Sequence, residues 1–226
     1  MSPRARVRAV VFDLDGTLVD SRRDILGAAE HALRAHGRPV LPPETILGFV
    51  GDGARSLVAR TFSLPVDAPE VDAPLASFLE HYAVHGADHT TVLPGVREVL
   101  SALSALPLAV CTNKMRGPAE LTLRHLGLRD AFRVVVAGGD LPEHKPDPSV
   151  LRHVASELGV APDSLAMVGD GPQDVLAGKA VSAWTVGLVS VFAPEETLRE
   201  TSPDALIRRM SELPDALARF AQATSE

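Results

Sequence analysis

The stretch AVVFDLDGT, residues 9–17, decides the fold and places the chemistry. Its first four residues form an apolar run, which is typical of a strand buried on both faces of a sheet. Asp13 and Asp15 follow at the point where that strand should end in a loop. Carboxylates close to a core are costly unless they are paired or bind a metal. The stretch therefore predicts a site for a cation, for covalent chemistry at a carboxylate, or for both.

Four further apolar runs recur in the second half of the chain, and helical patterns lie between them. The runs span residues 108–112, 134–137, 165–169 and 184–186, and the helical patterns span residues 96–105, 118–126, 148–158 and 174–180. This alternation predicts a doubly wound, Rossmann-like α/β core with a parallel sheet. Residues 205–207 are expected to add a short edge strand, and residues 214–223 a closing helix.

A helical block interrupts the alternation directly after the first strand. Its helical segments span residues 22–36, 43–49, 53–62 and 74–85, and its joins are rich in proline and glycine. We therefore predict an α/β catalytic core made of residues 1–17 and 91–226, with an inserted helical cap made of residues 18–90.

The bulk properties exclude several classes of protein. A net charge of −7 over 226 residues argues against a nucleic-acid binder, which usually carries a basic patch. The longest mostly apolar stretch, residues 180–193, is too short to span a bilayer. Cys111 is the sole cysteine, so no internal disulfide forms. We expect a soluble cytoplasmic protein, monomeric or homodimeric, whose partner is neither a nucleic acid nor a membrane.

Polar side chains follow four of the predicted strands. Because sites in open α/β sheets form outside the carboxyl ends of the strands, these loops should meet at one edge. The sequence leaves open whether Lys114 takes part in the site or lies on the surface. The side chains expected at the edge are Asp13, Asp15, Thr112, Asn113, Lys114, Lys145, Asp170 and Asp174.

These residues, in this order and spacing, resemble the four signature motifs of the haloacid dehalogenase superfamily. The most specific matches are DLDGTLVDS at residues 13–21 and GDGPQD at residues 169–174. Within the superfamily, the chain resembles the phosphoglycolate phosphatase branch. The motifs that carry this second resemblance are TNK at 112–114, GGD at 138–140, KPDP at 145–148 and GDGA at 51–54.

The resemblance implies roles for the acidic residues. Asp13 would be the nucleophile that forms an aspartyl-phosphate, and Asp15 would act first as general acid and then as general base. Mg²⁺ would be held by Asp13, by the backbone carbonyl of Asp15 and by Asp170, which suits a cation that prefers few carboxylates plus waters and substrate phosphate. Asp174 would orient Lys145 or a water molecule on the metal.

The resemblance also implies how the substrate is bound. Thr112 and the amide of Asn113 would contact phosphate oxygens, and Lys145 would bridge the nucleophile and the phosphate. In the cap, Gly53 and Arg55 are candidate substrate-binding residues, because an arginine there suits a substrate carboxylate.

A charge count adds an expectation about Asp15. Four aspartates face only Mg²⁺ and Lys145, so the site stays negative before a phosphate dianion enters. Since like charges raise the pKa of a carboxyl group, we expect Asp15 to be protonated in the substrate complex.

The predicted function is Mg²⁺-dependent hydrolysis of a small phosphate monoester, with 2-phosphoglycolate as first candidate. A phosphomutase of the β-phosphoglucomutase type and a pyrophosphatase or nucleotidase of the same fold are the alternatives. A phospho-accepting signalling module without turnover is the alternative from another class. The presence of Asp15 argues against a dehalogenase, and the absence of lysine before Lys114 argues against a phosphonatase, which needs a cap lysine.

Overall fold

The computed structural model describes residues 6–190 and 192–223, and its centre is a parallel sheet. The strands run in the spatial order β5-β4-β1-β6-β7-β8, and each neighbouring pair is parallel. This topology confirms the predicted doubly wound α/β core, including the edge strand. The strands are β1 (Ala9–Phe12), β4 (Leu108–Met115), β5 (Val134–Gly138), β6 (Leu165–Gly169), β7 (Trp184–Leu188) and β8 (Ala205–Ile207).

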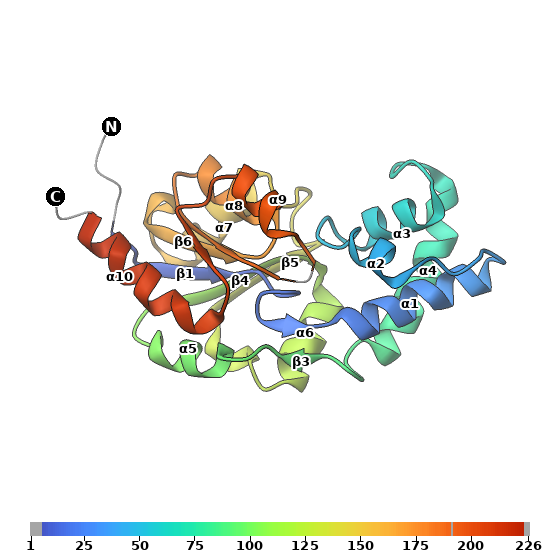
Figure 1. The fold of residues 1–226 in the computed structure, drawn as a ribbon, viewed down its shortest axis with the longest axis horizontal. Helices are drawn as coiled ribbons and strands as arrows, with labels where there is room; N and C mark the ends of the chain where they lie inside the picture. Colours follow the sequence, from blue (N-terminus) through green and yellow to red (C-terminus); the bar gives the residue numbers. More distant parts are fainter. Residues whose placement is uncertain (1–5, 191, 224–226) are drawn as a thin grey trace.

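Helices cover both faces of this sheet (Figure 1). Alternate residues of β1 face opposite layers, as the period of a strand requires. Val10 and Phe12 pack into a core shared with α5 (Val96–Ala102), α6 (Arg116–His125) and α10 (Leu213–Ala223). Ala9 and Val11 pack into the core on the other face, shared with α7 (Pro148–Leu158) and α8 (Pro172–Ala180).

Two elements differ from the predicted ones near the site. Strand β4 continues to Met115, and its pairing with β5 shifts register between Cys111 and Met115. Thr112, Asn113 and Lys114 therefore lie in the irregular end of a strand instead of in the loop behind it. Helix α9 (Glu195–Glu200), which the sequence pattern did not indicate, follows β7. The short 3₁₀ helices are η1 (Pro69–Val71), η2 (Arg129–Ala131), η3 (Pro162–Ser164) and η4 (Met210–Glu212).

The predicted cap segment is helical and has an apolar core of its own. It lies to the right of the sheet in Figure 1. Strand β2 (Val19–Asp20) pairs antiparallel with β3 (Thr91–Val92), so the chain leaves and re-enters the α/β part at one place. The large buried side chains of the cap core include Leu33, Ile46, Phe62 and Phe78. The helices of the cap are α1 (Arg22–Ala35), α2 (Pro43–Leu47), α3 (Ala54–Phe62) and α4 (Asp72–His85).

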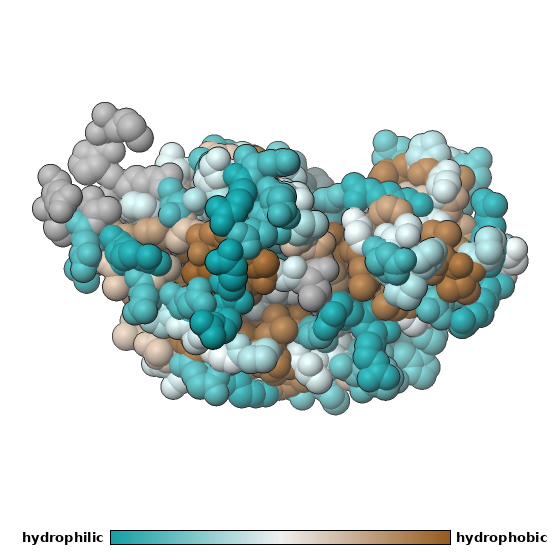
Figure 2. All heavy atoms as spheres, in the orientation of Figure 1, coloured by the Kyte–Doolittle hydropathy of each residue, from teal (hydrophilic) through white to brown (hydrophobic). Residues whose placement is uncertain are grey.

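The surface mixes polar and apolar side chains. Figure 2 shows that apolar side chains reach the surface in patches, several of them near the junction of the cap and the α/β part. Among residues 6–190 and 192–223, no helix combines the length and the apolar character needed to cross a membrane.

Candidate active site

A cavity of about 470 Å³ lies between the cap and the carboxyl ends of the strands. Asp13, Thr112 and Asp170 line it from the α/β part, and Gly53 and Tyr82 line it from the cap. The expected edge of the sheet therefore carries a pocket, and the cap closes one side of it. Its apolar lining includes Ile25, Val50, Leu57, Phe78, Leu79 and Leu176.

The turn after β1 brings the acids of the first motif into this pocket. The backbone N–H of Asp13 still bonds to the Val168 carbonyl at 2.9 Å, so Asp13 continues the sheet. The chain then reverses at Gly16, whose φ of +82° favours glycine. A Cβ at Gly16 would overlap the Asp170 carboxylate, which gives a second reason for glycine there. Asp13 is buried at this turn, with only 6% of its surface exposed.

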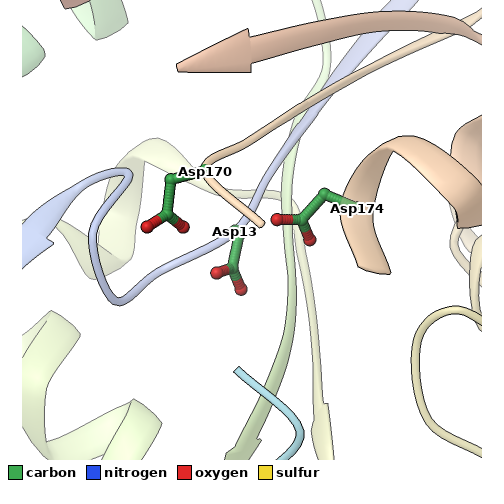
Figure 3. Close-up of side chains that lie close together, drawn as sticks. All are labelled: Asp13, Asp170 and Asp174. Carbon is green, nitrogen blue, oxygen red and sulfur yellow. The ribbon is translucent and has the colours of Figure 1, made fainter. Parts of the chain in front are cut away.

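Three buried carboxylates face a common space at the pocket floor (Figure 3). Asp13, Asp170 and Asp174 each offer an oxygen, and these oxygens lie within 4.8 Å of one another. The Lys145 ammonium donates to Asp13 at 2.8 Å and to Asp174 at 2.7 Å. The other Asp174 oxygen accepts the backbone N–H of Gly171 at 3.0 Å, at the start of α8. The structure thus brings the three aspartates and Lys145 together, as the positions of the strand ends predicted.

The charges in this cluster do not balance. Burial, with Asp13 and Asp174 nearby, raises the pKa of Asp170 well above its ordinary value. Burial also raises the pKa of Asp174 to about 6, although Lys145 opposes the rise. Burial alone would lower the pKa of Lys145, but the neighbouring carboxylates raise it, so this lysine stays charged. Three carboxylates facing one ammonium leave negative charge that a divalent cation would neutralise, and an all-oxygen donor set fits Mg²⁺.

The cluster predicts an unusual dependence of stability on pH. Acids whose pKa is raised by folding bind more protons in the folded state, so stability falls as pH rises from 3.8 through about 6 and beyond. In EDTA we expect the melting temperature to increase by about 3 °C when the pH is lowered from 8 to 6. Differential scanning calorimetry across this range measures it.

The matched variant for this experiment is Asp170→Asn, which removes one of the three charges. Its melting temperature in EDTA should change less between pH 8 and pH 6, and added Mg²⁺ should stabilise it less than the wild type. A wild-type melting temperature that is flat or falls on acidification would contradict this account of the cluster.

Asp15 lies apart from the three acids and has its own partners. The Ser21 hydroxyl donates to it at 2.6 Å, and the Lys114 ammonium lies 2.9 and 3.0 Å from its two oxygens. Lys114 also donates to the Tyr82 hydroxyl of the cap at 2.7 Å. Burial opposes charge on Lys114, but Asp15 and Tyr82 raise its pKa. In the free protein Asp15 is thus paired with an ammonium. The expectation that Asp15 is protonated was made for the substrate complex, and it stays a prediction.

The Thr112 hydroxyl lies at the pocket wall, whereas the Asn113 side chain bonds to backbone groups around the pocket. Thr112 is buried at the pocket wall, where its hydroxyl accepts the backbone N–H of Lys114 at 3.2 Å. The side-chain amide of Asn113 accepts from the Lys145 N–H at 2.9 Å and donates to the Lys145 carbonyl and the Gly51 carbonyl, both at 3.0 Å. This amide therefore braces the Lys145 segment and a cap loop. These bonds occupy the side-chain amide, so the predicted phosphate contact of Asn113 stays a prediction that its backbone N–H would have to meet.

Of the two candidate substrate-binding residues in the cap, Gly53 lies at the pocket and Arg55 does not. Gly53 lines the pocket with a φ of +86°, and a Cβ there would lie 3.2 Å from the Asn113 carbonyl, tighter than usual. Arg55 is not brought to the pocket: its guanidinium donates to the carbonyls of Val66 and Ala68 and to Asp72. Its place on α3 turns it toward this neighbouring cap segment.

Sequence reasoning missed several residues that the structure brings to the site. The Ser190 hydroxyl donates to Asp170 at 2.6 Å, and the Thr17 hydroxyl donates to the same carboxylate at 3.3 Å. Ser190 follows β7, so the rule about strand ends could have found it. Tyr82 and Arg60 reach the pocket from cap helices, and no spacing in the sequence indicated them.

Comparison with known proteins places the chain in a family. The sequence profile of the haloacid dehalogenase-like hydrolases matches residues 10–188. The chain belongs to this family. It is 43% identical to a phosphoglycolate phosphatase of Chromobacterium violaceum over 219 residues, 93% of this chain and 96% of that protein. It is 32% identical to an N-acetylmuramic acid 6-phosphate phosphatase of Pseudomonas aeruginosa, over 96% of this chain and 97% of that protein.

Solved structures agree with this placement. A crystal structure described as a predicted phosphoglycolate phosphatase from Haemophilus somnus superposes with a TM-score of 0.86 at 25% identity, over 93% of this chain and 98% of that one. The resemblance drawn from the motifs is confirmed, and so is the class of enzyme: this haloacid dehalogenase-like hydrolase is a phosphatase acting on phosphoric monoesters. That class favours turnover over a signalling module that only accepts a phosphoryl group.

Proposed function

We propose that this phosphatase hydrolyses 2-phosphoglycolate, with Mg²⁺ as cofactor, through an aspartyl-phosphate on Asp13. The observation that carries the proposal is the placement of Asp13. Its carboxylate is buried at the pocket floor and held by Lys145 at 2.8 Å, while a second acid, Asp15, lies in the same pocket. A fixed carboxylate beside a separate acid is what nucleophilic attack with protonation of a leaving group requires.

The reaction then runs in two displacements at phosphorus. An Asp13 oxygen forms a bond to phosphorus as the bond from phosphorus to the ester oxygen breaks, and the departing oxygen takes a proton from Asp15. In the second step Asp15 accepts a proton from water, whose oxygen attacks phosphorus and releases Asp13 and inorganic phosphate. General acid–base catalysis of this kind is worth about 10²–10⁴-fold in rate.

The buried acids suit the proposed cofactor. Asp13, Asp170 and the backbone carbonyl of Asp15 would hold Mg²⁺, which neutralises charge on the phosphoryl group when it is bound. Lys145 holds Asp13 on one side and is itself held by Asp174 on the other. Thr112 offers a hydroxyl at the pocket wall for a phosphate oxygen.

The contacts between the cap and the α/β part support a dry site. The cap meets the α/β part through the bond between Asn113 and Gly51 and through Tyr82. Closure of this kind excludes bulk water from the reacting groups. We propose a small phosphorylated metabolite as the partner of the chain; its place in the cytoplasm and its monomeric or homodimeric state remain predictions.

Steady-state kinetics on a panel of phosphate esters tests the proposed substrate. With Mg²⁺ present, kcat/KM for 2-phosphoglycolate should exceed the values for glucose 6-phosphate, pyrophosphate and a nucleoside monophosphate by about 10-fold or more. EDTA should abolish the activity, and Mg²⁺ should restore it. A preference for one of the other compounds would overturn the substrate, and activity that survives EDTA would overturn the cofactor.

A second candidate substrate is an acidic sugar phosphate. The cavity of about 470 Å³ is large for a two-carbon ester, and one relative is named for N-acetylmuramic acid 6-phosphate. That compound belongs in the same panel. A phosphomutase would instead convert a sugar phosphate into its isomer without net release of phosphate.

A further inference from the structure

The Lys114 ammonium lies in a buried position that the two displacement steps do not use. Only 8% of its side chain is exposed, against 13% for its partner Asp15. It contacts both Asp15 oxygens and the Tyr82 hydroxyl. A buried ammonium costs free energy unless it is well paired. Because Lys114 is buried, it cannot be explained as a solvated surface lysine.

The position of Lys114 relative to the reaction follows from its contact with Asp15. In the proposed mechanism Asp15 passes a proton to the ester oxygen, so Asp15 and that oxygen lie within hydrogen-bond reach in the complex. The ammonium beside Asp15 would therefore lie on the side of the leaving group in such a complex.

Tyr82 supplies a second donor at the same place. Burial raises the pKa of its hydroxyl, which stays protonated at neutral pH. Its oxygen accepts from Lys114, and among the described residues no acceptor is recorded for its own O–H. An ammonium and a hydroxyl side by side can both donate to one carboxylate. Hydrogen bonds to a charged group are stronger than hydrogen bonds between neutral groups. Because Tyr82 lies on cap helix α4 and Lys114 on β4, the pair exists only with the cap in place.

The other cation lining the pocket is a weaker candidate for this task. Among the described residues, the lining cations are Lys114 and Arg60. Arg60 is 43% exposed and already paired with Asp52 at 2.6 Å. It has no contact with Asp15, so nothing ties it to the ester oxygen.

We propose that Lys114 and Tyr82 form a subsite for a carboxylate one carbon away from the ester oxygen, so that the substrates are phosphate esters of short 2-hydroxy acids. The proposal rests on the proposed function and specifies its substrate class. The substrate carboxylate replaces Asp15 as the partner of the Lys114 ammonium. Asp15 is then released to face the ester oxygen, and an ester without the acid group leaves it paired with Lys114.

Binding of two phosphonates tests the subsite without turnover. In 3-phosphonopropionate a methylene replaces the ester oxygen of 2-phosphoglycolate, and propylphosphonate carries a methyl group in place of the carboxylate. Isothermal titration calorimetry with Mg²⁺ should show that the wild type binds the first more tightly. In Lys114→Met this preference should shrink by about 10- to 100-fold, as expected for loss of a charged hydrogen bond. Lys114→Arg should retain part of it.

Two further variants control for an effect of Lys114→Met on folding. Tyr82→Phe removes one hydroxyl and should reduce the preference several-fold, whereas Arg60→Met, at the other lining cation, should keep it. An unchanged preference in both Lys114→Met and Tyr82→Phe would overturn the subsite, as would its loss in Arg60→Met alone. Failure of the proposed function has a different signature: no Mg²⁺-dependent turnover of 2-phosphoglycolate by the wild type, whichever phosphonate binds better.

Discussion

An Asp13→Asn variant is expected to lose about 10⁴- to 10⁶-fold in kcat on its best phosphate ester, the range seen when a covalent nucleophile is removed. The amide cannot attack phosphorus as the carboxylate does. The fold should persist, because the change removes one charge from an overcharged cluster and leaves an oxygen for Lys145. Initial-rate assays with purified protein, together with a thermal melt of each sample, measure both outcomes.

The control for Asp13→Asn is the same substitution at Asp163. That side chain is exposed and precedes β6, whereas the pocket lies at the carboxyl ends of the strands. Asp163→Asn should leave kcat unchanged. If Asp13→Asn retained more than about one hundredth of the wild-type kcat after any deamidated protein had been removed, another group would be the nucleophile.

Replacing Lys145 with methionine should damage both activity and stability. The Lys145 side chain is 1% exposed and is the cation paired with Asp13 and Asp174. Without it three buried carboxylates face one another, and removing one partner of a buried pair typically costs about 3–5 kcal/mol. We expect kcat to fall by about 10³-fold, since the nucleophile loses its positioning and its charge partner. Urea unfolding and steady-state assays measure the two losses.

A double variant separates these two effects. Adding Asp174→Asn to Lys145→Met removes one of the unpaired charges, so part of the lost free energy of unfolding should return. The kcat should not return, because Asp13 still lacks its lysine. A Lys145→Met protein as stable as the wild type would contradict the charge account of the cluster.

Much of the α/β core could be predicted because its strands are short, apolar and buried on both faces. The bounds of β6 and β8 match the predicted runs residue for residue. Convergence of Asp13, Lys145, Asp170 and Asp174 follows from that topology alone, since parallel strands end at one edge. The β2–β3 pair escaped prediction because strands of two residues show no alternation.

The interface between cap and core was not predictable in the same way. Arg55 and Arg60 both lie on α3, and the sequence does not say which face of that helix meets the pocket. The Asn113 side chain turned out to brace the Lys145 backbone, a contact between residues far apart in sequence. The bond from Lys114 to Tyr82 likewise depends on how the cap is seated. Spacing within a motif carries no information about such contacts.

Asp13 is expected to become covalently phosphorylated during turnover. Borohydride reduction of a reaction quenched in mid-turnover, followed by peptide mass spectrometry, tests it directly, because borohydride converts an acyl phosphate of aspartate into homoserine. With 2-phosphoglycolate and Mg²⁺ present, residue 13 should be recovered partly as homoserine, while Asp15 and Asp170 stay unchanged. Homoserine at Asp15 or Asp170, or its absence from residue 13 during active turnover, would contradict the account.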